Sequence, residues 1–168
     1  VISAGVGTRS AIVAAAVTPI QYFAENYGVV IPYTMGGGHY MTITSGGSNI
    51  NKTTTTYYGL DPDWGSSIGG IYVGGYGPYY NYGPDCSSWV PWVFYNAGIS
   101  MQPRLAHEFR YLGTVQNMCG SYIAQPGDIL ENAHHVTVVV GTDEVNKVYY
   151  IAHARGGNYG TVITDRKS

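Results

Sequence analysis

Short segments rich in β-branched and aromatic residues, separated by turn sequences, fill the C-terminal part of the chain. Residues 135–140 (HVTVVV) and 148–152 (VYYIA) have the composition of strands, and residues 143–146 between them have that of a turn. Residues 129–130 and 161–164 extend the pattern on both sides. Because short connections join neighbouring antiparallel strands, the pattern predicts an antiparallel meander.

Two helical segments precede the meander. Residues 8–27 are rich in Ala, a strong helix former, with Thr8 as a candidate N-cap and Gly28 as a candidate C-cap. Pro19 lies inside this segment, and we expect it to kink or split the helix because proline has no backbone donor.

The second helical segment covers residues 85–98 (DCSSWVPWVFYNAG). Asp85 or one of the following serines is a candidate N-cap, and Gly98 is a candidate C-cap. Pro91 is best tolerated in a first turn, so we expect the helix to bend or to start one or two residues after Cys86. The order helix, helix, meander predicts an α+β domain with the helices packed on an antiparallel sheet.

A length of 168 residues fits a single domain, residues 1–168. Residues 36–84 form an insertion rich in Gly, Ser, Thr and Tyr, with seven tyrosines between residues 57 and 82. Two interpretations remain open: an ordered surface loop held by aromatic packing, or one wall of a binding groove.

Composition excludes several classes of protein. Charged residues make up 11% of the chain, the net charge is −2 and no basic block occurs, which argues against nucleic acid as a partner. No segment approaches the ~20 apolar residues of a membrane span. The two cysteines form no CxxC pair and no zinc-like cluster with histidine, so we expect no metal and no cofactor. The chain begins with Val, so it reads as a mature protein or an excised domain, and a missing signal peptide does not imply a cytoplasmic location.

Cys86 is the strongest candidate for a catalytic residue. It lies where the second helix should begin, and the partial positive charge of a helix N-terminus lowers the pKa of a thiol. The free N–H groups of the first turn are also suited to stabilise an oxyanion. Such chemistry further requires an imidazole as base and a third group that orients it.

Two histidines are well placed for these roles. His134 and His135 are adjacent at the start of a predicted strand and must point to opposite faces. His153 ends the neighbouring predicted strand. If the two strands pair antiparallel, His135 and His153 lie close together, and a triad of Cys86, His135 and His153 becomes possible.

Several short motifs, taken in order, resemble the NlpC family of papain-like cell-wall cysteine peptidases. The resemblance extends over about residues 8–155 and is densest from residue 83. The motifs are IPYTMGGG (31–38), GPDCSSWVPWVFYNAGI (83–99), PGDIL (126–130), HHVTVVVG (134–141) and IAHA (151–154).

The resemblance implies a papain-like α+β core and a secreted or wall-associated peptidoglycan hydrolase. The expected reaction is cleavage of the stem peptide between γ-D-glutamate and diaminopimelate or lysine. Cys86 then corresponds to the nucleophile, His135 to the general base and His153 to the residue that orients it. Further site residues implied by the resemblance are a tyrosine that lines the active site and the neighbours of the nucleophile, which would contact the substrate: Tyr33, Asp85, Ser87 and Ser88.

The sequence departs from the family pattern at a few positions. Ser88 stands where glycine is usual and is expected to crowd the cleft near the nucleophile, while Met35 replaces a common tryptophan and Thr137 a glycine. About fifty residues separate Tyr33 from Cys86. An insertion of this length affects the expected substrate preference more than the expected reaction.

Two other functions stay open. One is an amidase of the related CHAP type that cuts between muramic acid and L-alanine, although its third residue is usually Asn, Asp or Glu. The other is a non-catalytic wall-binding or structural domain with the same fold. Cys119 matches no motif and is interpreted as a partly buried free thiol, since a disulfide with Cys86 would silence an enzyme.

Overall fold

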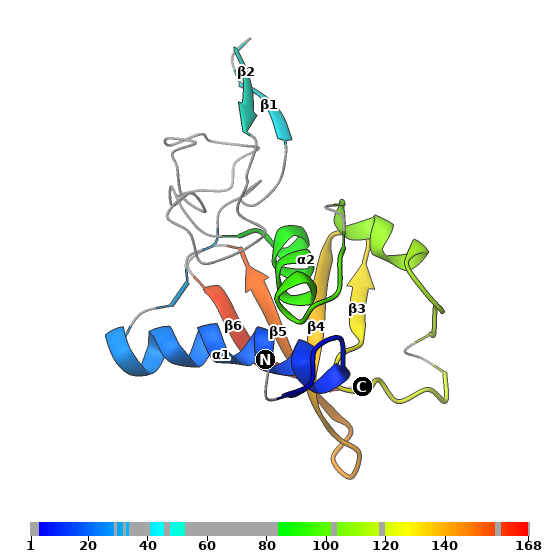
Figure 1. Cartoon of the computed structure of the whole chain (residues 1–168). Helices are drawn as coiled ribbons and strands as arrows, with labels where there is room; N and C mark the ends of the chain where they lie inside the picture. The colour runs from blue at the N-terminus through cyan, green and yellow to red at the C-terminus, as the bar shows by residue number, and fades with distance from the viewer. Residues whose placement is uncertain are drawn as a thin grey trace.

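The structure is a computed structural model, which describes residues 4–28, 30–31, 33, 41–45, 48–52, 84–101, 104–117, 120–156 and 159–167. Two α-helices precede a four-stranded antiparallel sheet, which confirms an α+β fold (Figure 1). The elements are α1 (Arg9–Tyr27), β1 (Met41–Ser45), β2 (Ser48–Lys52), α2 (Cys86–Asn96), the 3-10 helix η4 (Ala106–Tyr111), β3 (Ile129–Asn132), β4 (His135–Asp143), β5 (Val148–Arg155) and β6 (Gly160–Lys167).

The four C-terminal strands lie in the order β3-β4-β5-β6, and every neighbouring pair is antiparallel. The predicted meander is therefore confirmed. β4 runs past its predicted end because the register shifts between Val139 and Gly141, and pairing with β5 continues beyond this irregularity. β3 and β5 end, and β4 and β6 begin, at the upper edge of the sheet in Figure 1.

α1 begins and ends as its sequence predicts. The hydroxyl of Thr8 accepts a hydrogen bond from the N–H of Ala11 at 3.1 Å. Gly28 adopts the left-handed conformation at φ 65°, and its N–H bonds to the carbonyl of Ala24. Pro19 does not split the helix, which is continuous from Arg9 to Tyr27.

α2 begins at Cys86, directly after the N-cap Asp85. The carboxylate of Asp85 accepts the N–H of Ser88 at 2.8 Å, and the hydroxyl of Ser88 accepts the N–H of Asp85 at 3.0 Å. This reciprocal capping box fixes the start of the helix at Cys86. The start is one or two residues earlier than the one expected from the position of Pro91. The C-cap of α2 is Ala97 rather than Gly98, which follows it with a positive φ of 89°.

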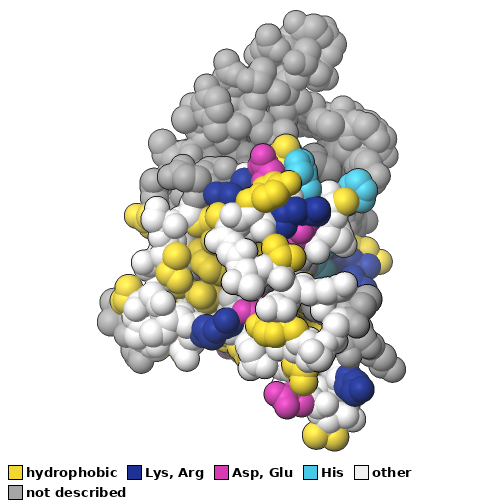
Figure 2. All heavy atoms as spheres, turned by 90° about the vertical axis from the view of Figure 1, so that its right-hand side faces the viewer, with side chains coloured by type: hydrophobic (Ala, Val, Ile, Leu, Met, Phe, Trp, Pro, Cys, Tyr) yellow, Lys and Arg dark blue, Asp and Glu magenta, His cyan; other side chains and the backbone are white. Residues whose placement is uncertain are grey.

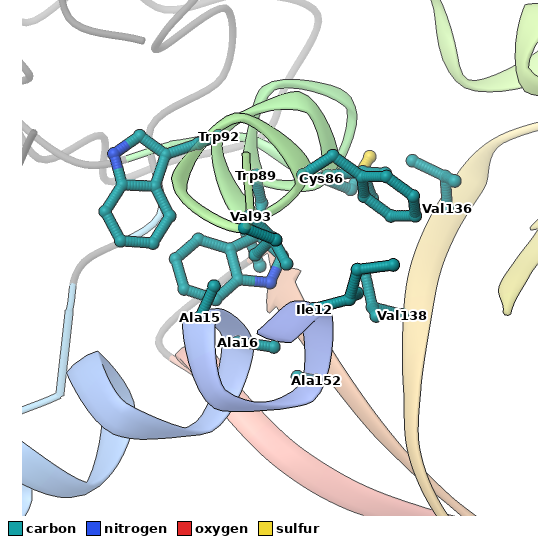
Figure 3. Close-up of a cluster of buried hydrophobic side chains, with 14 of the residues drawn as sticks. Ile12, Ala15, Ala16, Cys86, Trp89, Trp92, Val93, Val136, Val138 and Ala152 are labelled. Carbon is teal, nitrogen blue, oxygen red and sulfur yellow. The ribbon is translucent and has the colours of Figure 1, made fainter. Parts of the chain in front are cut away.

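The main hydrophobic core lies between the two helices and one face of the sheet (Figure 3). α2 contributes Trp89, which is fully buried and stacks on Trp92 with ring centroids 5.2 Å apart. The sheet contributes Val136 and Val138 of β4 together with small residues of β5. Because side chains alternate along a strand, the opposite face of β4 carries His135, Thr137 and Val139.

The turn before β3 ties α1 to the sheet. The carboxylate of Asp128 is contacted by Arg9 at 2.7 Å and by the hydroxyl of Tyr122 at 2.6 Å. Burial opposes ionisation of Asp128, but the hydrogen bonds from Tyr122, Gln125 and Arg9 together lower its pKa. The PGD sequence of this turn therefore has a structural role.

Most of the 36–84 insertion lies outside the described residues, as do His39 and Cys119. Within the insertion, β1 and β2 pair as a separate two-stranded antiparallel sheet, a hairpin that the sequence analysis did not predict. In the parts of the chain described here, no helix combines the length and hydropathy needed to cross a membrane.

Candidate functional site

Cys86 is the first residue of α2 and carries a free, buried thiol. The backbone N–H groups of Val136, Ser87 and Cys86 itself lie within hydrogen-bonding reach of the sulfur. Two of these donors come from the first turn of the helix and the third comes from β4. The sequence predicted the donors of the helix but not the donor of the sheet.

The electrostatic environment of the thiol differs from the one predicted. Burial raises the pKa of the Cys86 thiol to about 11, and the charge of Asp85 acts in the same direction. The three N–H groups around the sulfur lower the pKa but do not outweigh burial. The thiol is therefore protonated at neutral pH, whereas its position at a helix N-terminus had predicted a thiolate.

The two strand histidines do lie together. Nε2 of His135 and Nδ1 of His153 are 2.7 Å apart, and the rings meet edge to face. Nε2 of His153 is in turn 3.0 Å from the hydroxyl of Thr164 on β6. His153 is only 1% exposed and both of its ring nitrogens are engaged, whereas His135 is half-buried.

Both imidazoles favour the neutral form. Burial lowers the pKa of His135, and the charges of Arg166 and Arg155 lower it further. Burial, the neighbouring His135 and the same two arginines lower the pKa of His153 to about 4. At neutral pH the pair therefore consists of two uncharged rings joined by one shared proton.

The thiol and the imidazole pair are both connected to the first residues of β4, the thiol through the backbone of Val136 and the pair through His135. Val136 packs toward the helices, whereas His135 points to the other face of the sheet. The sulfur of Cys86 lies beside the main chain of Val136, one residue after His135. Among the contacts of the described residues, no hydrogen bond joins the sulfur to either imidazole. With Nε2 of His135 bonded to His153, the nitrogen left for the thiol is Nδ1, the one nearer the main chain.

The residues around Cys86 that were predicted to contact substrate serve the helix cap. Asp85, Ser87 and Ser88 are all buried. The hydroxyl of Ser87 donates to the Asp85 carboxylate at 3.1 Å, and that of Ser88 donates to the Asp85 carbonyl at 3.2 Å. The hydroxyl of Ser88 is thus turned back into the cap of α2.

Tyr33 lies at the same end of the sheet as the histidines. Ile31 pairs with Thr161 at the start of β6, and the N–H of Thr161 donates to the Ile31 carbonyl at 2.7 Å. Tyr33, two residues after Ile31, is half-buried, and its ring lies beside the turn after β5. A Cβ added to Gly156 in this turn would lie 3.7 Å from Cε1 of Tyr33. The predicted site tyrosine is therefore close to the strand that carries His153.

A hollow of about 630 Å³ lies between the end of α2, η4 and β3. Its lining includes Arg104 and an ion pair in which Arg110 contacts Glu131 at 2.6 Å. Glu131 is paired with Val136 across β3 and β4, so one lining residue of the hollow neighbours the strand position whose backbone contacts the thiol. The sequence analysis did not identify these charged residues, because only the strand register connects them with Cys86.

Thr164 is a second residue that the sequence did not reveal, because a threonine in a β-branched segment looks like any strand residue.

His107 and His134 are exposed and stand apart from the pair. Basic and acidic side chains are interspersed over the face shown in Figure 2, without a continuous basic patch. Within the described ranges, no group of three or more His, Cys, Asp or Glu residues is suited to hold a metal ion.

Compared with known proteins, the chain matches no family model, no curated protein and no solved structure.

Proposed function

We propose that this protein is a cysteine endopeptidase that hydrolyses the stem peptide of peptidoglycan between γ-D-glutamate and diaminopimelate or lysine, outside the cell or in its wall. The resemblance of its motifs to the NlpC family suggests the substrate. One observation carries the chemistry: the free thiol of Cys86 lies against the main chain next to His135, whose imidazole is held by His153. The reaction we propose needs no metal.

The first step begins from a neutral thiol and a neutral imidazole. Nδ1 of His135 takes the proton of Cys86 while the sulfur attacks the scissile carbonyl carbon, so that a C–S bond forms as the C=O double bond becomes an oxyanion. The proposal requires that the sulfur and Nδ1 of His135 come into contact when substrate binds. The backbone N–H groups of Cys86 and Ser87, which act on the sulfur in the free protein, would have to turn to the oxyanion as it forms, since Asp85 occupies the N–H of Ser88.

The second step releases the amine product. The imidazolium of His135 gives its proton to the leaving nitrogen as the C–N bond breaks, which leaves a thioester on Cys86. Water, activated by the same imidazole, then hydrolyses the thioester and restores the thiol. The contact with His153 keeps Nε2 of His135 occupied throughout, so that only Nδ1 exchanges protons with the substrate.

The charged hollow beside β3 suits a peptide that carries both carboxylates and an ammonium group. Arg104 and the Arg110–Glu131 ion pair line the hollow, so it presents charged groups of both signs. Stem peptides with diaminopimelate or lysine have charges of both signs.

The test is digestion of stem peptides with a free N-terminus and, separately, of purified peptidoglycan, followed by mass spectrometry of the soluble products. Endopeptidase activity releases L-alanyl-γ-D-glutamate from stems with a free N-terminus, whereas a CHAP-type amidase releases intact stem peptides. Cys86→Ala should abolish release without loss of the folded state. If wild-type protein releases neither product, or if Cys86→Ala releases as much as wild type, the proposal is wrong.

A non-catalytic wall-binding domain is the second candidate, and one observation favours it. A thiol with a pKa raised to about 11 by burial resembles that of a structural cysteine more than that of an activated nucleophile. Sedimentation with insoluble peptidoglycan, equal for wild type and Cys86→Ala and without release of soluble products, would support this alternative.

A further inference from the structure

We infer that Arg155 and Arg166 form a binding site for a carboxylate group on the face of the sheet that carries His135 and His153. The identity of the ligand, the free α-carboxylate of the γ-linked glutamate in a stem peptide, rests on the proposed function. The site itself rests on the strand register and on the contacts of the two arginines.

Both arginines lie on the same face of the sheet as the imidazole pair. Arg155 is two residues after His153 on β5. Arg166 is two residues after Thr164 on β6, and the hydroxyl of Thr164 is 3.0 Å from Nε2 of His153. Because side chains alternate along a strand, residues two positions apart share a face, with main chains roughly 7 Å apart. The charges of both arginines act on both imidazoles, which agrees with this placement.

The two guanidinium groups have no carboxylate partner in the part of the chain that the structure describes. Arg9 contacts a carboxylate at 2.7 Å and Arg110 contacts one at 2.6 Å. Among the described residues, no ion pair is formed by Arg155 or by Arg166. Their charges therefore remain available to an anion that approaches this face.

The acidic side chains of the neighbouring strands point to the other face. Glu131 is paired with Val136 and Asp165 is paired with Tyr150, and partners across two strands share a face. Val136 and Tyr150 both alternate with the residues of the imidazole face. The other residues that β3 and β4 place beside the imidazole pair on this face carry no charge. The two arginines therefore give the face a positive potential, which attracts an anion.

Arg155 is held in position without being neutralised. Its guanidinium carbon lies 3.8 Å from the centre of the Tyr159 ring, and its side chain is half-buried. Stacking on the ring restricts the guanidinium group but leaves its N–H edge for an acceptor. A planar guanidinium binds a carboxylate through two parallel hydrogen bonds. Arg166 is exposed on the adjacent strand and supplies a second positive charge.

A stem peptide contains a group of this chemistry. In a γ-linked glutamate the side-chain carboxyl group forms the peptide bond, so the α-carboxylate stays free. The imidazoles of His135 and His153 favour the uncharged form, so the positive charge that this carboxylate meets comes from the two arginines.

The test is made on a Cys86→Ala protein, in which the proposed reaction cannot consume the ligand. The probe is L-alanyl-γ-D-glutamyl-L-lysine amide, whose single carboxylate is the α-carboxylate of glutamate. The control ligand is the same peptide with this group as a carboxamide. Binding is measured at constant ionic strength from the ¹H–¹⁵N shifts of the histidine and arginine side chains.

Three substitutions in this background each remove one positive charge. Arg155→Gln and Arg166→Gln change the site, and Arg166 is exposed, so its variant carries the test if Arg155→Gln does not fold. Lys147→Gln is the matched control, because Lys147 is exposed in the turn before β5, at the opposite end of that strand from Arg155.

We expect the carboxylate peptide to bind roughly tenfold or more tightly than the carboxamide peptide, because only the carboxylate forms charge-assisted hydrogen bonds. Arg155→Gln should remove this preference, Arg166→Gln should reduce it and Lys147→Gln should retain it. Without ligand, Arg155→Gln should also raise the pKa of both histidines, since a neighbouring positive charge is removed.

Equal affinity for the two peptides, or a preference that survives both arginine substitutions, would overturn the inference. Histidine pKa values that do not change in Arg155→Gln would do the same, because the guanidinium group would then lie away from the pair. If inorganic phosphate binds in an Arg155-dependent way while the two peptides bind equally, the assignment to a stem-peptide carboxylate is wrong. Absence of hydrolysis by the wild type would refute the proposed function instead, while the affinities of the two peptides would still decide the inference.

Discussion

The sulfur of Cys86 lies within hydrogen-bonding reach of the backbone N–H of Val136, so the thiol meets β4 one residue after His135. This contact joins a helix on one face of the sheet to an imidazole on the other. It lies at the end of the sheet where β4 begins, because Val136 is the second residue of that strand. The predictions below follow from this placement.

We expect Cys86 to react slowly with iodoacetamide at pH 7. Only the thiolate is alkylated, and with a pKa of about 11 very little of the thiol is ionised. In a Cys119→Ser protein, whose single thiol is Cys86, the rate at pH 7 should be roughly a hundredfold lower in buffer than in urea, where the thiol has an ordinary pKa near 8.5. Fast alkylation of the folded protein at pH 7 would instead indicate a preformed thiolate.

His135→Ala should lower kcat/KM by about 10²- to 10⁴-fold, the usual contribution of a general base. His134→Ala is the matched control, because His134 is adjacent and exposed, and it should change kcat/KM by less than about twofold. His153→Ala should have a smaller effect than His135→Ala, since it removes a group that orients the base. Peptide hydrolysis by the three variants measures the order, and a larger loss for His134→Ala than for His135→Ala would contradict it.

Much of the fold could be predicted because each element carries a local signal. Thr8, Gly28 and Asp85 mark helix ends by capping chemistry, and the β-branched segments mark the strands. The proline rules were less reliable. Pro19 and Pro91 both lie inside continuous helices, because the burial of α1 and α2 against the sheet outweighs the loss of one backbone hydrogen bond in each.

Acidification should destabilise the folded protein through His153. Its pKa is about 4 when folded and near 6.5 when unfolded, so between these values the unfolded chain binds more protons and the free energy of unfolding falls as the pH falls. Urea unfolding at several pH values from 7 to 4 measures this slope. In His153→Gln the slope should be smaller, whereas the exposed control His107→Gln should keep it. An identical slope in His153→Gln and wild type would show that this imidazole is not the cause.

The site could be predicted only in part, for a physical reason. The pairing of His135 with His153 follows from strand alternation and an antiparallel register, both readable from the sequence. The pKa of Cys86 depends on burial, which no local pattern reports. Thr164 became visible only when the register of β5 and β6 was known.

Gly160 should be intolerant of any side chain, because two constraints meet there. Its φ is 71°, in the left-handed region, and an added Cβ would lie 2.5 Å from the carbonyl oxygen of Ile31. That oxygen accepts the N–H of Thr161, the bond that holds the segment leading to Tyr33 against β6. Gly160→Ala should therefore lower the free energy of unfolding by about 1–3 kcal/mol, measured in urea, and also weaken peptide hydrolysis because Tyr33 is displaced.

Gly113→Ala is the control for Gly160→Ala. An added Cβ at Gly113 would meet no atom within 4 Å, and its φ lies outside the left-handed region. Its free energy of unfolding should stay within about 0.5 kcal/mol of the wild type, with hydrolysis unchanged. If Gly160→Ala is as stable as Gly113→Ala, the close approach of β6 to Ile31 does not exist in solution. If Gly160→Ala is destabilised but hydrolyses peptide at the wild-type rate, Tyr33 has no part in the reaction.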